Sequence, residues 1–192
     1  MKNAVVRGVW RALRFVGAER LSWNLQYRAS YWTADHAPRS QHLLAIINEH
    51  APDYLVEFGC GEGGLADQVE RFARYQGYDI SDEAVRCAAP RPNCSVTQMD
   101  MRDWNGDSNV DMAVLEECLY YLDEPAQRRF LKTLGSSLAA DGRAVVIVHS
   151  RTKHRRTIDV VRSELPILDE RDVEQRVFLV VGPPAGPADR QE

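Results

Sequence analysis

The strongest constraint on the fold is an alternation of short apolar segments with longer helical segments, which begins at residue 54. Apolar runs of four to eight residues bounded by turn residues are typical of strands. On this basis we expect strands at residues 54–58, 76–80, 95–99, 110–115, 143–148 and 176–181. Strands that alternate with helices form βαβ units, and therefore predict an α/β fold whose mostly parallel sheet is covered on both faces.

Helix signals fill the intervals between these strands. Residues 65–75 have helical periodicity, and Ser81 precedes two acidic residues as an N-cap should. Asp123 begins a longer amphipathic segment, and Ser40 is placed to cap a helix that precedes the first strand. The sequence thus predicts helices after the first, second and fourth strands and one helix before the sheet.

Length and composition favour one domain with an appendage. The chain has 192 residues, of which 44% are hydrophobic and 27% charged, as in ordinary globular proteins. We expect residues 1–39 to form an N-terminal helical cap and substrate lid, residues 40–181 the main domain, and residues 182–192 a disordered tail. No apolar run has the roughly 20 residues of a membrane span, and the four cysteines match no disulfide or zinc spacing. We therefore expect a cytoplasmic protein without a bound metal.

Positive charge is concentrated in two segments of an otherwise acidic chain. Residues 1–28 carry six basic side chains and one acid, and residues 149–157 carry four arginines and lysines with no acid. The net charge is nevertheless −4. A basic amphipathic helix at residues 4–16 is expected to pack on the body, although such helices also lie on membranes.

A glycine-rich turn follows the first strand. Gly59, Gly61 and Gly64 satisfy the pattern G-x-G-x-x-G, and Asp79 follows about 20 residues later, as in dinucleotide sites. The negative charges of Glu57 and Glu62 in this turn oppose a dinucleotide, because they would face its pyrophosphate. A repulsion of this kind costs about 4 kcal/mol at 4 Å in an effective dielectric of 20.

S-adenosylmethionine (SAM) suits the same turn better. It has no phosphate, and its sulfonium and ammonium groups favour nearby carboxylates. Acids follow successive strands of the predicted sheet, at Glu57, Asp79, Asp100 and Glu116. Ligands of open α/β sheets bind at the carboxyl ends of the strands, where these acids should meet.

These residues carry a resemblance to a known family. From residue 40 to residue 181 the chain resembles the Rossmann-like, class I SAM-dependent methyltransferases. The four segments that resemble family motifs are residues 56–63, 77–81, 99–102 and 110–122. The last of these is most similar to small-molecule N-methyltransferases of the nodulation type. The resemblance implies a doubly wound, mostly parallel sheet with an antiparallel last strand.

The resemblance also implies roles for single residues. The acid Glu57 would serve the amino group of the cofactor's methionine part, and Asp79 would bind both ribose hydroxyls. Asp100 would accept a hydrogen bond from the adenine amine. The residues expected to bind SAM are Glu57, Gly59, Cys60, Gly61, Gly63, Asp79, Ile80, Asp100, Met101 and Glu116.

Methyl transfer mainly requires that the acceptor is held close to the methyl group and that water is excluded. A base is needed only where the acceptor arrives protonated. We expect His149, at the end of the fifth strand, to be that base, and Tyr120 to orient the acceptor. Of the adjacent acids Glu116 and Glu117, one should face the cleft, and we expect it to be Glu116. A capping or solvated role for His149 and a core role for Tyr120 stay open.

The expected acceptor is a small anionic metabolite, methylated on nitrogen or oxygen. The side chains expected to contact it are Tyr31, Trp32, His36, Arg39 and Arg151. Two alternatives stay open: an RNA or nucleotide methyltransferase that uses residues 1–28 and 149–157, and a noncatalytic SAM-binding scaffold. The pI of about 5.8 and the lack of a recognition domain argue against a nucleic-acid partner. The basic N-terminal helix leaves a homodimer open.

Overall fold

A computed structural model describes residues 18–29 and 39–185 of the chain. The helix expected at residues 4–16 and the tail beyond residue 185 lie outside these residues. Within the described part, no helix is long and apolar enough to cross a membrane.

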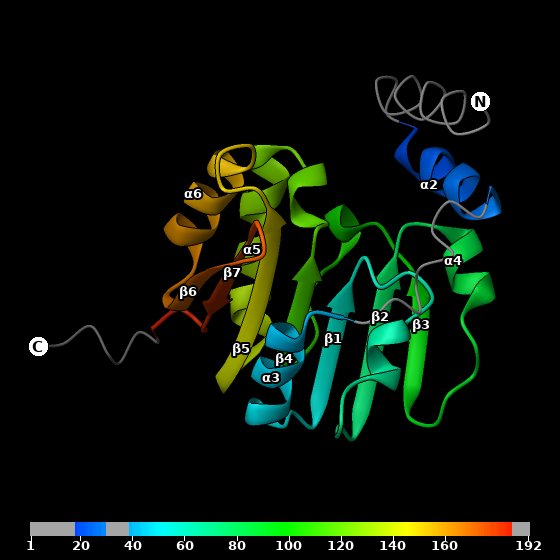
Figure 1. Ribbon diagram of the computed structural model, residues 1–192, viewed down its shortest axis with the longest axis horizontal. Coiled ribbons are helices and arrows are strands. Elements are labelled where there is room, and N and C mark those ends of the chain that lie inside the picture. Colours follow the sequence, from blue (N-terminus) through cyan, green and yellow to red (C-terminus); the bar gives the residue numbers. More distant parts are fainter. Residues whose placement is uncertain (1–17, 30–38, 186–192) are drawn as a thin grey trace, which may run out of the picture.

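A single sheet of seven strands forms the centre of the described structure, in the order β3-β2-β1-β4-β5-β7-β6 (Figure 1). Its strands are β1 (Tyr54–Phe58), β2 (Arg74–Asp79), β3 (Cys94–Gln98), β4 (Val110–Glu116), β5 (Leu138–His149), β6 (Ile167–Val173) and β7 (Arg176–Val181). The pairs among β1 to β5 are parallel, and β7 is antiparallel to both of its neighbours. This is the mostly parallel, Rossmann-like sheet that the sequence predicts.

Helices and short helical turns connect and cover the strands. The α-helices are α2 (Glu19–Arg28), α3 (Gln41–His50), α4 (Asp82–Cys87), α5 (Glu124–Ser137) and α6 (Arg155–Glu164). The 3₁₀ turns are η1 (Gly64–Asp67), η2 (Met101–Asp103) and η3 (Leu119–Tyr121). Two predicted caps are confirmed, because Ser81 accepts from the Ala84 N–H and Asp123 from the Ala126 N–H. The helix expected before the sheet is α3, and Ser40 is its N-cap residue, but the Ser40 side chain makes no capping hydrogen bond.

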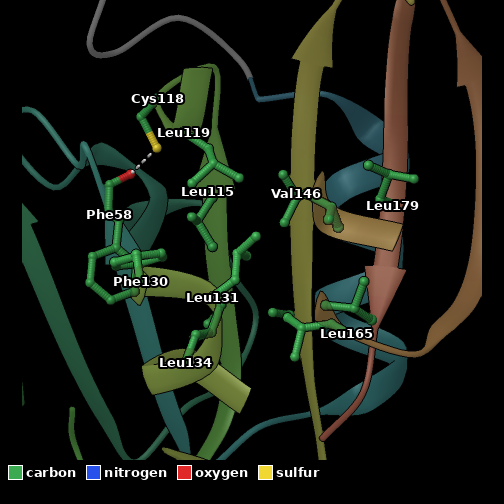
Figure 2. Packing of buried hydrophobic residues seen from close by; sticks show 14 of the residues in the cluster. Phe58, Leu115, Cys118, Leu119, Phe130, Leu131, Leu134, Val146, Leu165 and Leu179 are labelled. Carbon is green, nitrogen blue, oxygen red and sulfur yellow. Dashed lines mark hydrogen bonds between the residues drawn. The ribbon is translucent and has the colours of Figure 1, made fainter. Parts of the chain in front are cut away.

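Two apolar layers pack on opposite faces of the sheet. One layer contains α5 and α6, whose Leu131, Leu134 and Val161 are fully buried against β4, β5 and β7 (Figure 2). The other contains α3, whose Leu43 and Ile47 are also fully buried. In β5, alternate residues point to the two layers, so both faces of the strand are covered. The carboxyl ends of the parallel strands stay free of this packing and can carry a site.

Two segments differ from the sequence-based expectation. The helix expected at residues 65–75 is only the turn η1, because β2 begins at Arg74, which pairs with Tyr54 of β1. Too few residues then remain for a helix and a connection. The strand β6 was not expected, because its charged residues and its position at the sheet edge hide the apolar pattern.

Candidate functional site

The glycine turn after β1 folds back on the end of β2. The N–H groups of Gly59 and Cys60 both donate to the Tyr78 carbonyl. Gly59 has a φ of +67°, and a Cβ placed there would lie 2.9 Å from the Cβ of Cys118. The Cys118 thiol in turn donates to the Phe58 carbonyl, which fits a core role for this cysteine. The turn therefore approaches β4 too closely for any residue but glycine at position 59.

We expect Gly59→Ala to weaken SAM binding and to destabilise the fold. The positive φ costs an L-residue about 1–2 kcal/mol, and the close approach to Cys118 adds to this cost. Calorimetric titration with SAM and urea unfolding would measure the two effects. Gly106→Ala is a matched control, because Gly106 also has a positive φ, of +100°, but lies outside the glycine turn. Equal SAM affinities of Gly59→Ala and the unmodified protein would contradict the expectation.

Asp79 closes the glycine turn from the β2 side. Its carboxylate accepts the N–H of Gly61 at 2.9 Å and the N–H of Ser81 at 2.8 Å. Only 7% of the residue is exposed. Burial raises the pKa of Asp79, and the two backbone hydrogen bonds act in the opposite direction. The carboxylate is thus held in one orientation at the strand end.

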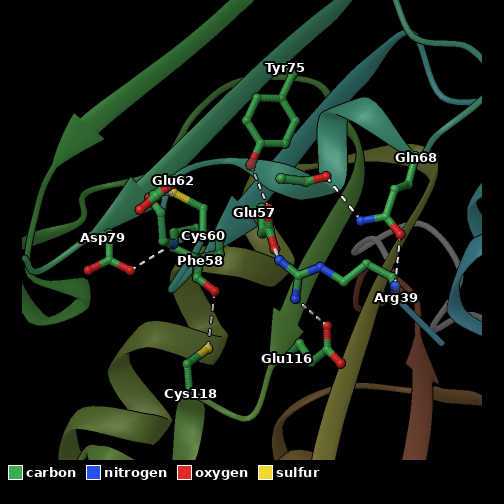
Figure 3. A network of polar contacts seen from close by, with 12 residues as sticks. Arg39, Glu57, Phe58, Cys60, Glu62, Gln68, Tyr75, Asp79, Glu116 and Cys118 are labelled. Atoms are coloured by element: carbon green, nitrogen blue, oxygen red, sulfur yellow. Dashed lines mark hydrogen bonds and ion pairs between the residues drawn. The ribbon is translucent and has the colours of Figure 1, made fainter. Parts of the chain in front are cut away.

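Arg39 connects two acidic strand ends (Figure 3). Its Nη2 lies 2.9 Å from Oε1 of Glu57, and its Nη1 lies 2.6 Å from Oε2 of Glu116. The other oxygen of Glu57 accepts from the Tyr75 hydroxyl, and Arg176 donates to Glu116 at 3.0 Å. The segment before α3 thereby supplies the cation that pairs these buried acids. This use of Arg39 differs from the acceptor contact that the sequence predicts.

Burial dominates the ionisation of Glu57, of which 1% is exposed. It raises the pKa of Glu57 to about 7, although Arg39 and the hydrogen bond from Tyr75 act to lower it. The phenol of Tyr75 also has a raised pKa, because it is buried and lies beside Glu57.

We expect Glu57 to make the stability of the protein depend on pH. The unfolded carboxyl loses its proton near pH 4.5 and the folded one near pH 7, so the folded state binds the extra proton between these values. The stabilisation by protonated Glu57 is complete below the unfolded pKa and is lost as the pH rises through the folded pKa. The free energy of unfolding then falls by up to about 1.4 kcal/mol per pH unit.

Glu57→Gln should remove this dependence. Urea unfolding at about pH 5, 6, 7 and 8 would give the difference in unfolding free energy between wild type and variant. The unfolding free energy of the wild type should fall relative to that of the variant as the pH rises to the folded pKa, and the difference should then stay constant. A difference that is constant across the series would contradict the shifted pKa.

A cavity of about 520 Å³ opens at the carboxyl ends of the strands. Pockets that bind small molecules typically enclose about 300–1,000 Å³, so this volume is adequate. The polar residues that line it include five carboxylates and three guanidinium groups, so its lining is net negative. The lining includes Trp23, Tyr27, Arg39, Gly59, Cys60, Asp79, Ile80, Asp100, Met101, Arg102, Glu116, Glu117, Tyr120, Tyr121, His149 and Arg176.

Helix α2 closes one side of the cavity. It lies beside α4 (Figure 1) and is bound to it by polar contacts. Arg20 and Asn24 both donate to Asp82, and the Ser81 hydroxyl donates to Asn24. Trp23 packs edge-on against Tyr121, with the ring centroids 5.3 Å apart. Trp23 and Tyr27 of this helix line the cavity.

The far end of the cavity is formed after β4. Glu117 has a φ of +58°, which is uncommon outside glycine and marks a strained position. Its Oε2 accepts from the Tyr120 hydroxyl at 2.7 Å and from the N–H of His149 at 3.1 Å. The Tyr120 ring stacks on His154 with centroids 3.9 Å apart, and burial raises the pKa of its phenol. Glu117, Tyr120 and His149 therefore meet at one end of the cavity.

The predicted site residues divide into three groups. Most of the predicted cofactor residues, with Arg39, Tyr120 and His149, line the cavity, whereas Glu57, Gly61 and Gly63 lie outside its lining. The predicted contacts at residues 31, 32 and 36 lie outside the described residues. Arg151 does not line the cavity and is bound by Glu170 and Asp172 instead, which does not fit its predicted contact with the acceptor.

The sequence-based assignment missed two arginines of the cavity lining, Arg102 and Arg176. It favoured Glu116 over Glu117, whereas both acids line the cavity. Arg102 pairs with Asp100 and with Glu19 of α2, and Arg176 reaches Glu116 from β7. Spacing alone could not show the contacts of Arg102 with Glu19 and of Arg176 with Glu116, because these partners lie far apart in the chain. In the described part of the structure, no group of three or more His, Cys, Asp or Glu side chains could hold a metal ion.

Comparison with known proteins names the family. Residues 55–142 match the family model described as a methyltransferase domain. This segment of the chain is therefore a methyltransferase domain. A stretch of 75 residues of this methyltransferase is 33% identical to trans-aconitate 2-methyltransferase from Acidovorax sp. strain JS42. The match covers 37% of the present chain and 29% of the relative.

Solved structures show the same fold. The N-methyltransferase NodS from Bradyrhizobium japonicum WM9, in complex with S-adenosylhomocysteine (SAH), has a TM-score of 0.65 at 17% identity, over 80% of this chain and 92% of its own. A TehB-like methyltransferase from Corynebacterium glutamicum has a TM-score of 0.66 at 17% identity, over 84% and 98%. These structures confirm the predicted fold class. The methyltransferase domain at residues 55–142 and the methyltransferase relative agree with the predicted family, enzyme class and cofactor SAM.

Proposed function

We propose that this methyltransferase transfers a methyl group from SAM to a nitrogen or oxygen atom of a small molecule. The observation that carries the proposal is the convergence of the glycine turn and the acidic strand ends on one cavity. Gly59, Asp79, Asp100 and Glu116 come from four separate segments and all line it. Helix α2 closes the cavity from the opposite side, which leaves a bounded space for an acceptor.

The lining fits SAM better than a dinucleotide. Carboxylates outnumber guanidinium groups there, which favours a ligand with sulfonium and ammonium charges and opposes a pyrophosphate. Asp79 would bind the ribose hydroxyls, and Ile80, Asp100 and Met101 would contact adenine. Arg39, which lines the cavity between Glu57 and Glu116, would keep these two acids in place beside the cofactor. Bound SAM supplies an electrophilic methyl group, and SAH is the product of its transfer.

The residues around this cofactor have mainly a positioning role. Orientation of the reacting groups and exclusion of water can supply roughly 7–11 kcal/mol of the barrier reduction. Tyr120 and the aromatic residues of α2 would hold the acceptor, and His149 would take its proton where one must leave. An anionic acceptor has weaker support, because Arg151 is bound by two acids away from the cavity.

The test is calorimetric titration of the full chain with SAM, SAH and NAD. We expect SAM and SAH to bind and NAD not to bind, because only the dinucleotide carries a pyrophosphate. Transfer of radiolabel from methyl-labelled SAM to a panel of small amines, alcohols and carboxylates would then show the activity. Binding of NAD in place of SAM, or binding of SAM without transfer to any acceptor class, would contradict the proposal. A transfer to RNA instead would favour the nucleic-acid alternative.

A further inference from the structure

The arginines that line the cavity are all bound to acids. Arg39 is paired with Glu57 and Glu116, and Arg102 with Asp100 and Glu19. Arg176 is 3.0 Å from Glu116 and 3.8 Å from Glu117. An anionic acceptor would have to displace one of these carboxylates and leave it partly buried without its cation, which is costly.

One carboxylate in the cavity lining has an oxygen that lacks a hydrogen-bond donor among the described residues. This carboxylate belongs to Glu117. Its Oε2 is held by Tyr120 and by the N–H of His149, so the side chain has a fixed direction. Its Oε1 is shielded from solvent and accepts no hydrogen bond from the part of the chain that the structure describes; Arg176 lies at ion-pair distance only. A buried acceptor atom without a donor costs about 1–3 kcal/mol, and more when it is charged. Because Glu117 lines the cavity, a ligand there whose N–H group reached this oxygen would remove that cost.

Four aromatic rings also line the cavity, and two of them, Trp23 and Tyr121, pack against each other. Trp23 and Tyr27 come from α2, and Tyr120 and Tyr121 from the turn after β4. The electron-rich faces of such rings attract cations, and the attraction is strengthened where water is excluded. A carboxylate beside an aromatic wall is an arrangement by which proteins bind ammonium groups.

We propose that the methyl acceptor is a small amine, and that Glu117 binds its ammonium group against the wall of Trp23, Tyr27, Tyr120 and Tyr121. This assignment rests on the proposed methyl transfer and adds the chemical class of the acceptor. The ammonium first loses a proton to His149, which lines the cavity and passes it to solvent. The nitrogen lone pair then forms the new N–C bond as the C–S bond breaks, and the electron pair of that bond stays on sulfur.

The test compares amines with carboxylates of the same shape on the SAH-loaded protein. Phenethylamine is matched with 3-phenylpropionate, and tryptamine with indole-3-propionate, and each is titrated calorimetrically. We expect at least one amine to bind at least tenfold more tightly than its matched carboxylate. Tighter binding of the carboxylates, equal binding within each pair, or no binding of either amine would overturn the proposal.

Glu117→Gln assigns the preference to one side chain. The variant keeps an oxygen for Tyr120 and the N–H of His149 but loses the charge, so amine affinity should fall at least tenfold while SAH affinity stays unchanged. Glu164→Gln is the matched control, because Glu164 pairs with Arg128 on α6, outside the cavity, and its variant should bind amines normally.

The outcomes separate this proposal from the methyltransferase function. An equal loss of amine and SAH affinity in Glu117→Gln would mean that Glu117 serves the cofactor, which overturns the assignment. Unchanged amine affinity in the variant would overturn it as well. If the unmodified protein bound neither SAM nor SAH, the proposed function itself would have failed, whatever the amines do.

Discussion

Asp79→Asn should weaken SAM binding by about 10²–10⁴-fold. A hydrogen bond to a charged group contributes about 1.5–3 kcal/mol, and a carboxylate that binds two ribose hydroxyls would lose about twice that. The substitution also places an amide beside the N–H groups of Gly61 and Ser81, where two acceptor oxygens are needed. Both effects act in the same direction, and calorimetric titration with SAM and SAH measures their sum.

Asp172→Asn is the control for this substitution. Asp172 pairs with Arg151, and 62% of its side chain is exposed, so the same chemical change there should leave SAM affinity unchanged. Thermal unfolding of both variants without ligand shows whether Asp79→Asn is still folded. A folded Asp79→Asn with the affinity of the wild type would remove Asp79 from the cofactor site.

Arg39→Leu should destabilise the fold by about 3–5 kcal/mol at about pH 8. Removal of one partner from a buried ion pair leaves an uncompensated charge, and Arg39 pairs two acids at once. The loss should be smaller at about pH 5, where Glu57 is protonated in the folded state and makes no charged pair. Urea unfolding at both pH values measures the effect.

Arg151→Leu is a matched control, because Arg151 also contacts two acids. Its side chain is 39% exposed, whereas that of Arg39 is 20% exposed, and surface pairs contribute only about 0–1 kcal/mol. The double variant Arg39→Leu/Glu57→Gln should recover part of the loss, since it removes the uncompensated charge. If Arg39→Leu and Arg151→Leu were equally stable at high pH, the buried pairs would not have the importance assigned to them.

Much of the fold could be predicted because its signals are local. Apolar alternation and caps such as Ser81 and Asp123 depend on neighbouring residues, and the structure confirms them. The prediction of a helix at residues 65–75 was wrong for a non-local reason, because Arg74 pairs with β1 and so belongs to β2. Strand β6 was missed because an edge strand needs few buried residues, and charged side chains conceal it.

The meeting of the glycine turn and the acidic strand ends at one cavity was predictable to a similar degree. Gly59, Asp79 and Asp100 follow strands in order, and parallel strands bring their carboxyl ends to one edge of the sheet. The ion pairs of the arginines were not predictable, because they join distant segments. Arg39 reaches two strand ends, while Arg151 follows β5 directly and yet pairs with two acids of β6, which β7 separates from β5 in the sheet.

Residue type and short spacing were enough to predict the fold class, the glycine turn and the acidic strand ends, and the resemblance to methyltransferases rests on these same segments. Local geometry converts each of these patterns directly into structure. The pairing of charges, in contrast, became known only from the folded chain. The fold pairs the cavity arginines with carboxylates and leaves one oxygen of Glu117 without a hydrogen bond among the described residues. Ion pairing depends on distances between side chains far apart in the chain, which composition and spacing do not contain.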